Sequence, residues 1–138
     1  MDKKYILAID TTNEETGIGL VGENRLRIVT WISHRNQSKE LLPNINKLLK
    51  KEKISPAELK WIVVNLGPGS FTGLRVGVST ANTLGYGLNI AVIGKANLDG
   101  EITDRIEALF KLKTLVKKFK QVLPHYGRPP RITLPKKQ

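Results

Sequence analysis

The chain has 138 residues and a formal net charge of +11, from 23 Lys and Arg against 12 Asp and Glu. It contains no cysteine, which excludes disulfides and thiolate metal sites, and no apolar run approaches the roughly 20 residues that span a bilayer. Length and composition are typical of one domain, and the start shows no long apolar signal segment, so a cytoplasmic protein is expected.

Three strands are predicted in the first third of the chain. Residues 5–9 are almost continuously apolar, which is typical of a central strand buried on both faces. Residues 16–21 and 25–32 follow, joined by a turn at 22–24. The third strand alternates, so its even and odd positions lie on opposite faces. An antiparallel meander is expected.

Helices and strands alternate in the next part of the chain. Ser38 is placed to cap a first helix, with Pro43 near its first turn, where a missing N–H costs least. Residues 55–58 (SPAE) have the pattern of a capping box and precede a strand at 61–66. A second main helix from Leu74 to about Leu84 and a fifth strand at 90–93 are predicted after a glycine-rich loop.

The glycine-rich loop is residues 67–77, GPGSFTGLRVG. A strand, a glycine turn and a helix start in succession can hold an anion or let two backbones approach closely. No Lys-Ser or Lys-Thr pair follows Gly73, and Gly69 and Gly73 are one residue too far apart for the dinucleotide fingerprint. Ser70 or Thr72 is interpreted as a helix N-cap rather than a nucleophile.

The same loop, with residues 83–94 (TLGYGLNIAVIG), closely resembles the TsaB family, a non-catalytic subunit of the bacterial machinery that makes threonylcarbamoyladenosine in tRNA. Three further segments agree in order: ILAIDTT at 6–12, ELLP at 40–43 and YGRPPRITLPKK at 126–137. Typical members carry about a hundred more residues between positions 95 and 124. The resemblance therefore implies a reduced member of this family.

The predicted order of elements, and the resemblance, imply an α/β fold of the ribonuclease-H-like type shared with the actin-like ATPases. Residues 1–95 are expected to form this domain, with a mixed five-stranded sheet. Residues 96–123 are expected to supply a C-terminal helix, over 101–122, in place of the usual second half. That helix is predicted to pack on the sheet face opposite at least part of the first helix. Residues 124–138 are expected to be an extended basic tail that runs back across the domain.

Asp10 ends the first strand, where nucleases and ATPases of this fold place an acid that faces metal or phosphate. Thr11 and Thr12 offer hydroxyls beside it, so these residues form a candidate vestigial nucleotide-facing loop. The alternative interpretation is that all three cap the turn after the strand. One acid is too little for two-metal hydrolysis, so no catalytic residue and no metal site is predicted.

The resemblance also implies that the two main helices pack against equivalent helices of a partner. The residues predicted for this interface are Leu41, Ile45, Leu48, Gly73, Leu74, Arg75, Gly77, Val78 and Ala81. The alternative is that these apolar positions belong to the chain's own core.

The function implied is a scaffold that binds and stabilises a TsaD-type catalytic subunit, together with a TsaE-type ATPase. It would be a homodimer when alone, reach tRNA through the complex, and need no cofactor or membrane of its own, with ATP and metal on the partner subunits. One rival is a small actin-like or ribonuclease-H-like nucleotide-binding enzyme. Another is a basic RNA-binding module, because residues 101–138 hold 10 Lys and Arg against 3 Asp and Glu.

Overall fold

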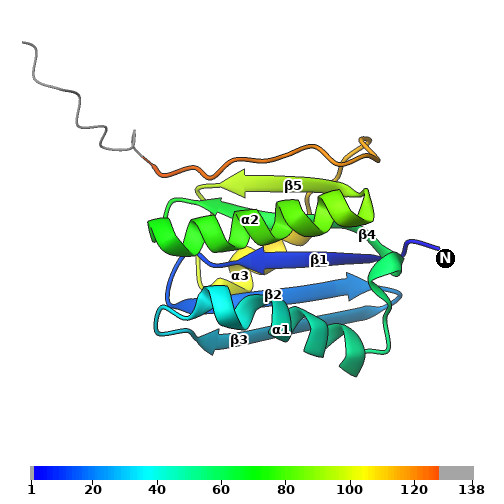
Figure 1. The fold of residues 1–138 in the computed structure, drawn as a ribbon, viewed down its shortest axis with the longest axis horizontal. Coiled ribbons are helices and arrows are strands. Elements are labelled where there is room, and N and C mark those ends of the chain that lie inside the picture. Colours follow the sequence, from blue (N-terminus) through cyan, green and yellow to red (C-terminus); the bar gives the residue numbers. More distant parts are fainter. Residues whose placement is uncertain (1, 128–138) are drawn as a thin grey trace, which may run out of the picture.

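The computed structural model describes residues 2–127, which form a five-stranded mixed sheet with helices on both faces (Figure 1). The elements in chain order are β1 (Tyr5–Asp10), β2 (Glu15–Gly22), β3 (Arg25–Ile32), α1 (Gln37–Lys51), the short 3-10 turn η1 (Pro56–Glu58), β4 (Leu59–Gly67), α2 (Phe71–Leu88), β5 (Ala91–Ala96) and α3 (Ile102–Phe110). The strand order is β3-β2-β1-β4-β5, antiparallel across β1, β2 and β3 and parallel across β1, β4 and β5. The predicted α/β class and five-stranded mixed sheet are confirmed.

The sheet separates two apolar cores, because successive side chains of a strand point to opposite faces. In β1, Leu7 and Ile9 pack toward α1 and α2, whereas Ala8 between them packs toward α3. Gly17 and Gly19 of β2 also lie under α3. A Cβ on either would come within 2.7 Å of an Ile106 or Phe110 side-chain atom, so these glycines let α3 approach the strand closely. The predicted placement of α3 opposite the first helix is confirmed (Figure 1).

The start of α1 differs from the sequence prediction. The helix begins at Gln37, with Asn36 as its N-cap, and Asn36 makes no side-chain capping bond among the described residues. The predicted Ser38 cap is therefore wrong, and Pro43 lies inside the helix rather than in its first turn. Gln37 instead turns inward, and its amide donates to the backbone oxygen of Asn13 and to Thr16 Oγ1. These long-range bonds fix the position of the start of α1, although they do not cap its first amides.

Two other predicted helix starts are confirmed. Ser55 and Glu58 form the capping box that opens η1. Ser70 caps α2 by accepting a hydrogen bond of 3.2 Å from the Gly73 amide. The helix itself is longer than predicted, running from Phe71 to Leu88, and it ends at Asn89, whose φ of 51° is the left-handed cap conformation.

The predicted helix over 101–122 is wrong beyond Phe110. Residues 111–127, which we call the C-terminal arm, contain no regular helix or strand, and the later part of the arm runs alongside β5 (Figure 1). The physical reason is that the arm's apolar side chains serve both cores: Leu112 packs on the α3 side, whereas Phe119 and Val122 pack on the α2 side. One straight helix on one face cannot reach both.

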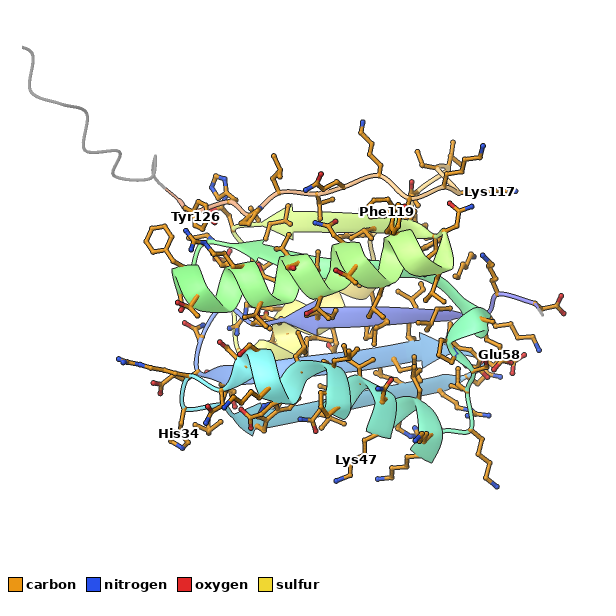
Figure 2. All side chains as sticks on the ribbon, viewed as in Figure 1. His34, Lys47, Glu58, Lys117, Phe119 and Tyr126 are labelled. Carbon is orange, nitrogen blue, oxygen red and sulfur yellow. The ribbon has the colours of Figure 1, made fainter. Side chains whose placement is uncertain are left out.

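Hydrogen bonds fix the arm to the domain. The Val122 amide and carbonyl bond the Asn82 side chain of α2 at 3.0 and 2.9 Å, and the His125 amide donates to the Leu66 carbonyl at 2.7 Å. Figure 2 shows Phe119 and Tyr126 near opposite ends of α2. The arm therefore runs back across the domain as far as residue 127. Of the predicted tail at 124–138, only residues 124–127 are described, so its path stays a prediction. Over residues 2–127, no helix is long and apolar enough to cross a membrane.

The two phenylalanines of this region provide a test of the arm's path. We expect Phe110→Ala and Phe119→Ala each to lower the free energy of unfolding by about 2 kcal/mol, measured by urea denaturation. Because the side chains pack on opposite faces of the sheet, the two losses should add within about 0.5 kcal/mol. The charge reversals Lys113→Glu and Lys120→Glu, at exposed arm positions, should change it by less than about 0.5 kcal/mol. Strong coupling between the phenylalanines would contradict the described path.

Candidate functional site

The carboxyl ends of β1, β4 and β5 meet the start of α2, which is where open parallel sheets bind ligands. Asp10 lies here with its side chain fully buried. Its Oδ1 accepts hydrogen bonds from the Thr12 amide at 3.1 Å and from Thr12 Oγ1 at 2.7 Å. Its Oδ2 accepts from Asn65 Nδ2 at 2.9 Å and from Arg105 Nε at 3.0 Å. Both oxygens are engaged within the chain, which favours the turn-capping interpretation.

Arg105 is the residue at this site that the sequence analysis missed. It comes from α3, 95 positions after Asp10, and its side chain is 13% exposed. It also donates from Nη1 to the Gly100 carbonyl at 2.8 Å, so its orientation is fixed. A buried carboxylate is tolerated where a cation and hydrogen bonds compensate its lost hydration. The charge that would face a metal or phosphate is instead paired with Arg105.

Thr11 lies under the first turns of α2. Its Oγ1 donates to the Gly73 carbonyl at 2.6 Å, and its own carbonyl accepts from the Gln37 amide at 3.3 Å. A Cβ on Gly73 would collide with the Thr11 carbonyl, and one on Gly77 with Thr11 Oγ1. Of the two roles open to the glycine-rich loop, close backbone approach is therefore the one that these contacts support.

Three backbone amides at the start of α2 already donate within the chain. The Ser70 amide donates to the Thr12 carbonyl at 2.9 Å, the Gly73 amide to Ser70 Oγ, and the Leu74 amide to the Ser70 carbonyl at 2.8 Å. A cavity of about 240 Å³ remains at this edge, between Asn13, Asn97 and Arg105. It is smaller than the roughly 300–1,000 Å³ of typical small-molecule sites. In the described part of the chain, no three His, Cys, Asp or Glu side chains are grouped to hold a metal.

The predicted interface residues need a correction. Eight of the nine are buried within the chain itself: Leu41, Ile45, Leu48, Gly73, Leu74, Gly77, Val78 and Ala81. They fill the core between the two helices and the sheet, because the helix face that is apolar in sequence is the face turned inward. Only Arg75 is exposed. The large apolar side chains that these helices do expose are Leu42 (44%), Phe71 (46%) and Tyr86 (75%).

Two glycines of α2 form a matched pair for testing the close approach. We expect Gly77→Ala to lower the free energy of unfolding by about 1–3 kcal/mol, because its new methyl group would displace Thr11. Gly87→Ala, in the same helix, meets no atom within 4 Å among the described residues and should raise stability by about 0.5–1 kcal/mol. Urea denaturation gives both values. Equal effects of the two substitutions would contradict the contact.

A second prediction concerns the buried carboxylate. Asp10→Asn removes the charge that pairs with Arg105 and replaces one of the two acceptor oxygens by an NH2 donor. Whichever way the amide turns, this donor faces other donors, so we expect a loss of about 3 kcal/mol in the free energy of unfolding. Asp99→Asn, at an exposed loop position, removes the same charge and should change it by less than about 0.5 kcal/mol. If Asp10→Asn were as stable as the parent chain, the pairing with Arg105 would have no structural role.

Comparison with known proteins identifies the fold family and the protein family. A family model described as "TsaD: tRNA N6-adenosine threonylcarbamoyltransferase" matches residues 28–108, more than half of the chain. A Bacillus subtilis protein named tRNA threonylcarbamoyladenosine biosynthesis protein TsaB is 40% identical over 68% of this chain and 42% of its own length. A Haemophilus influenzae protein of the same name is 30% identical over 81% of this chain and 46% of its own length.

Solved structures agree. A Pseudomonas aeruginosa crystal structure titled as an uncharacterized protein with similarity to peptidase YEAZ is 27% identical, with a TM-score of 0.66, over 69% of this chain and 44% of that one. The chain thus spans less than half the length of these relatives. The predicted ribonuclease-H-like, actin-like fold is confirmed. The chain belongs to the family that the TsaD model describes and, within it, to the TsaB family.

Proposed function

We propose that this chain acts in the biosynthesis of threonylcarbamoyladenosine in tRNA, as a non-catalytic scaffold subunit. The names of its relatives support the pathway. The observation that carries the non-catalytic role is the state of Asp10, whose two oxygens accept four hydrogen bonds from Thr12, Asn65 and Arg105. A carboxylate held in this way is not available to bind a metal or a phosphate-bound magnesium ion. In this proposal, ATP and metal are bound by the partner subunits, in the cytoplasm.

The rival proposal, a small nucleotide-hydrolysing enzyme, is separated by an activity measurement. We expect the purified full chain to show no magnesium-dependent turnover of ATP above the rate of a buffer blank, and no cleavage of RNA or peptide. The measurement is phosphate release at saturating ATP, with Asp10→Ala run in parallel. Turnover that requires magnesium, and that disappears in an Asp10→Ala variant shown by circular dichroism to be folded, would support the enzyme and contradict the scaffold.

The partner is proposed to dock on the outer face of α1 and α2. This layer covers one face of the sheet, whereas α3 covers the other (Figure 1). Leu42 of α1, and Phe71 and Tyr86 of α2, are the large apolar side chains that it exposes. Arg75 is exposed on α2 and lines a groove of about 340 Å³ between the helix and the C-terminal arm. Exposed aromatic and Arg side chains are enriched at protein interfaces.

In this proposal, the same face takes a TsaD-type catalytic subunit or a second copy of the chain, and a TsaE-type ATPase joins the assembly. A scaffold changes its partner's activity only through contacts that favour one conformation of that partner. Because the two assemblies share one surface, the homodimer and the heterodimer are expected to compete.

A pair of leucines with similar exposure tests the docking face. We expect Leu42→Glu to weaken association with a TsaD-type subunit at least tenfold, because a carboxylate would be buried unpaired at the interface. Leu26, 47% exposed on the β3 edge strand against 44% for Leu42, is the control: Leu26→Glu should leave affinity within twofold. Isothermal titration calorimetry gives the affinity, and sedimentation velocity gives the homodimer fraction.

Two outcomes would contradict this docking face. One is equal weakening by Leu42→Glu and Leu26→Glu, which would mean that added negative charge alone impairs association. The other is an effect of Leu26→Glu only, which would place the partner on the β3 edge instead.

A further inference from the structure

A cavity of about 700 Å³ lies at the end of the sheet opposite Asp10, where β1 and β4 begin. Its lining includes Lys3 from the segment before β1, Lys60 and Trp61 from β4, and residues 113–117 of the C-terminal arm. This volume is within the roughly 300–1,000 Å³ of small-molecule and cofactor sites. The proposed function uses neither this cavity nor these residues.

The cavity is strongly basic. Lys3, Lys60, Lys113 and Lys117 line it, and no Asp or Glu of the described residues does. Within residues 2–127, none of these lysines pairs with an acid; the nearby Lys4, in contrast, is bonded to Glu23 at 2.9 Å. Several unpaired lysines around one concave surface raise the local concentration of anions. An anionic ligand is therefore the class that this charge pattern fits.

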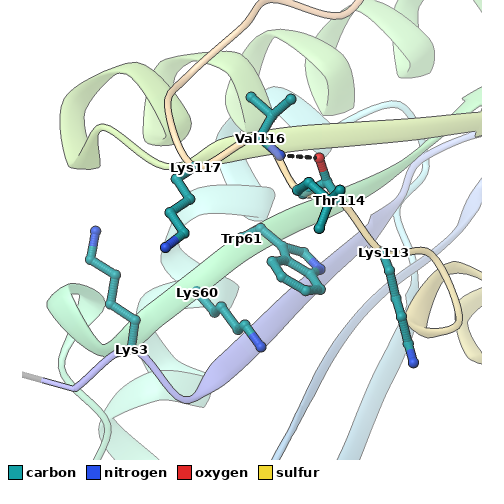
Figure 3. Close-up of a pocket in the computed structure, with 8 residues that line it drawn as sticks. Lys3, Lys60, Trp61, Lys113, Thr114, Val116 and Lys117 are labelled. Atoms are coloured by element: carbon teal, nitrogen blue, oxygen red, sulfur yellow. Dashed lines mark hydrogen bonds between the residues drawn. The ribbon is translucent and has the colours of Figure 1, made fainter.

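An aromatic ring lies among these lysines. Trp61 is half-buried in the cavity, with Lys60 Nζ 4.6 Å from its ring centroid, and Figure 3 shows Lys60 and Lys113 on different sides of the indole. The indole N–H is shielded from water and finds no acceptor among the described residues. A buried donor without a partner is unfavourable. The N–H faces away from solvent, so the ligand would meet the ring and the lysines; an anion that also carries a flat ring matches both.

The basic surface extends beyond this cavity. A second cavity of about 200 Å³, between β5 and the C-terminal arm, shares Thr114 and Val116 with the first and adds Lys118 and Lys120. The arm carries five lysines and no Asp or Glu between residues 111 and 127. Contiguous cavities lined by lysines match a chain of phosphates better than a single nucleotide.

We propose that this surface binds single-stranded RNA, with one base against Trp61 and successive phosphates on Lys60, Lys113 and Lys117. A base must be unstacked to reach the indole, which favours a single strand over a duplex. Stacking on an aromatic side chain with lysines along the backbone is the common mode of sequence-tolerant single-strand binding. An acidic polypeptide or an anionic membrane could bind the lysines, but neither would account for the Trp61 ring among them.

The test uses the full chain and fluorescein-labelled octauridylate and octaadenylate, with affinity measured by fluorescence anisotropy at several salt concentrations. The double charge reversal Lys113→Glu/Lys117→Glu is expected to weaken binding at least tenfold. It should also reduce the slope of log K against log salt by about 1.4, the value for two lost phosphate contacts on a single strand. The matched control Lys39→Glu/Lys47→Glu makes the same change in net charge on exposed positions of α1, and should weaken binding less than threefold.

A second readout reports on the indole. In a Trp31→Phe background, Trp61 is the one remaining tryptophan, and unlabelled oligonucleotide should quench its fluorescence. Trp61→Leu should weaken binding at least fivefold, and circular dichroism shows whether that variant is folded. If Trp61→Leu does not fold, the quenching of Trp61 fluorescence and the Lys113→Glu/Lys117→Glu variant still test RNA binding at this cavity.

Three outcomes would overturn the proposal of RNA binding. If the control variant Lys39→Glu/Lys47→Glu lost as much RNA affinity as Lys113→Glu/Lys117→Glu, the net charge of the chain alone would attract the RNA. Polyglutamate or phosphatidylserine vesicles that bind through the same lysines, with no RNA binding, would identify an acidic protein or a membrane as the ligand. AMP that binds as tightly as octaadenylate would make the site one for a free nucleotide. Failure of association with a TsaD-type subunit would leave this RNA test unaffected, because it needs no partner.

Discussion

The buried Asp10 carboxylate is the interaction on which the rest of the domain depends. A fully buried charge is costly unless a cation and several donors replace its water. Here the donors come from the turn after β1, from β4 through Asn65 and from α3 through Arg105, so the acid connects three elements that are distant in sequence. The turn that it fixes also places Thr11 beneath α2. The positions of β4, α2 and α3 around β1 therefore share one polar centre.

Local patterns predicted most of the sheet and several helix starts. The apolar run of β1, the SPAE capping box and the Ser70 cap depend on residues close in sequence, and each was predicted from those residues. The Ser38 cap was wrong because Gln37, one position earlier, has partners at Asn13 and Thr16 that lie more than twenty residues away. Arg105 was missed for the same reason, since nothing near it in sequence points to Asp10. Contacts between residues far apart in the sequence could not be predicted from local patterns.

The residues after Phe110 show a different limit of sequence reasoning. Their apolar side chains recur at helical spacing, yet Leu112 and Phe119 belong to cores on opposite faces of the sheet. Periodicity reports which residues are apolar together, but not whether one surface is available to cover them all. The same limit applies to the predicted interface residues. An amphipathic helix indicates that one face is buried, but not whether this chain or a partner covers it; in the structure, Leu41 and Val78 are buried in this chain's own core.

Three parts of the surface differ in charge and in hydrogen bonding. At the carboxyl ends of the parallel strands, the side chains of Asp10, Thr11 and Ser70 are hydrogen-bonded within the chain, so these groups offer little to a ligand. At the amino ends, the four cavity lysines pair with no acid in the described chain, and Lys60 lies over the ring of Trp61. The outer face of α1 and α2 is different again, with apolar side chains beside Arg75. In a domain of the actin-like fold whose usual ligand edge is largely paired within the chain, the two proposed binding surfaces therefore lie elsewhere. They differ in charge, and the residues proposed to bind on each are different, so the two proposals are compatible with each other.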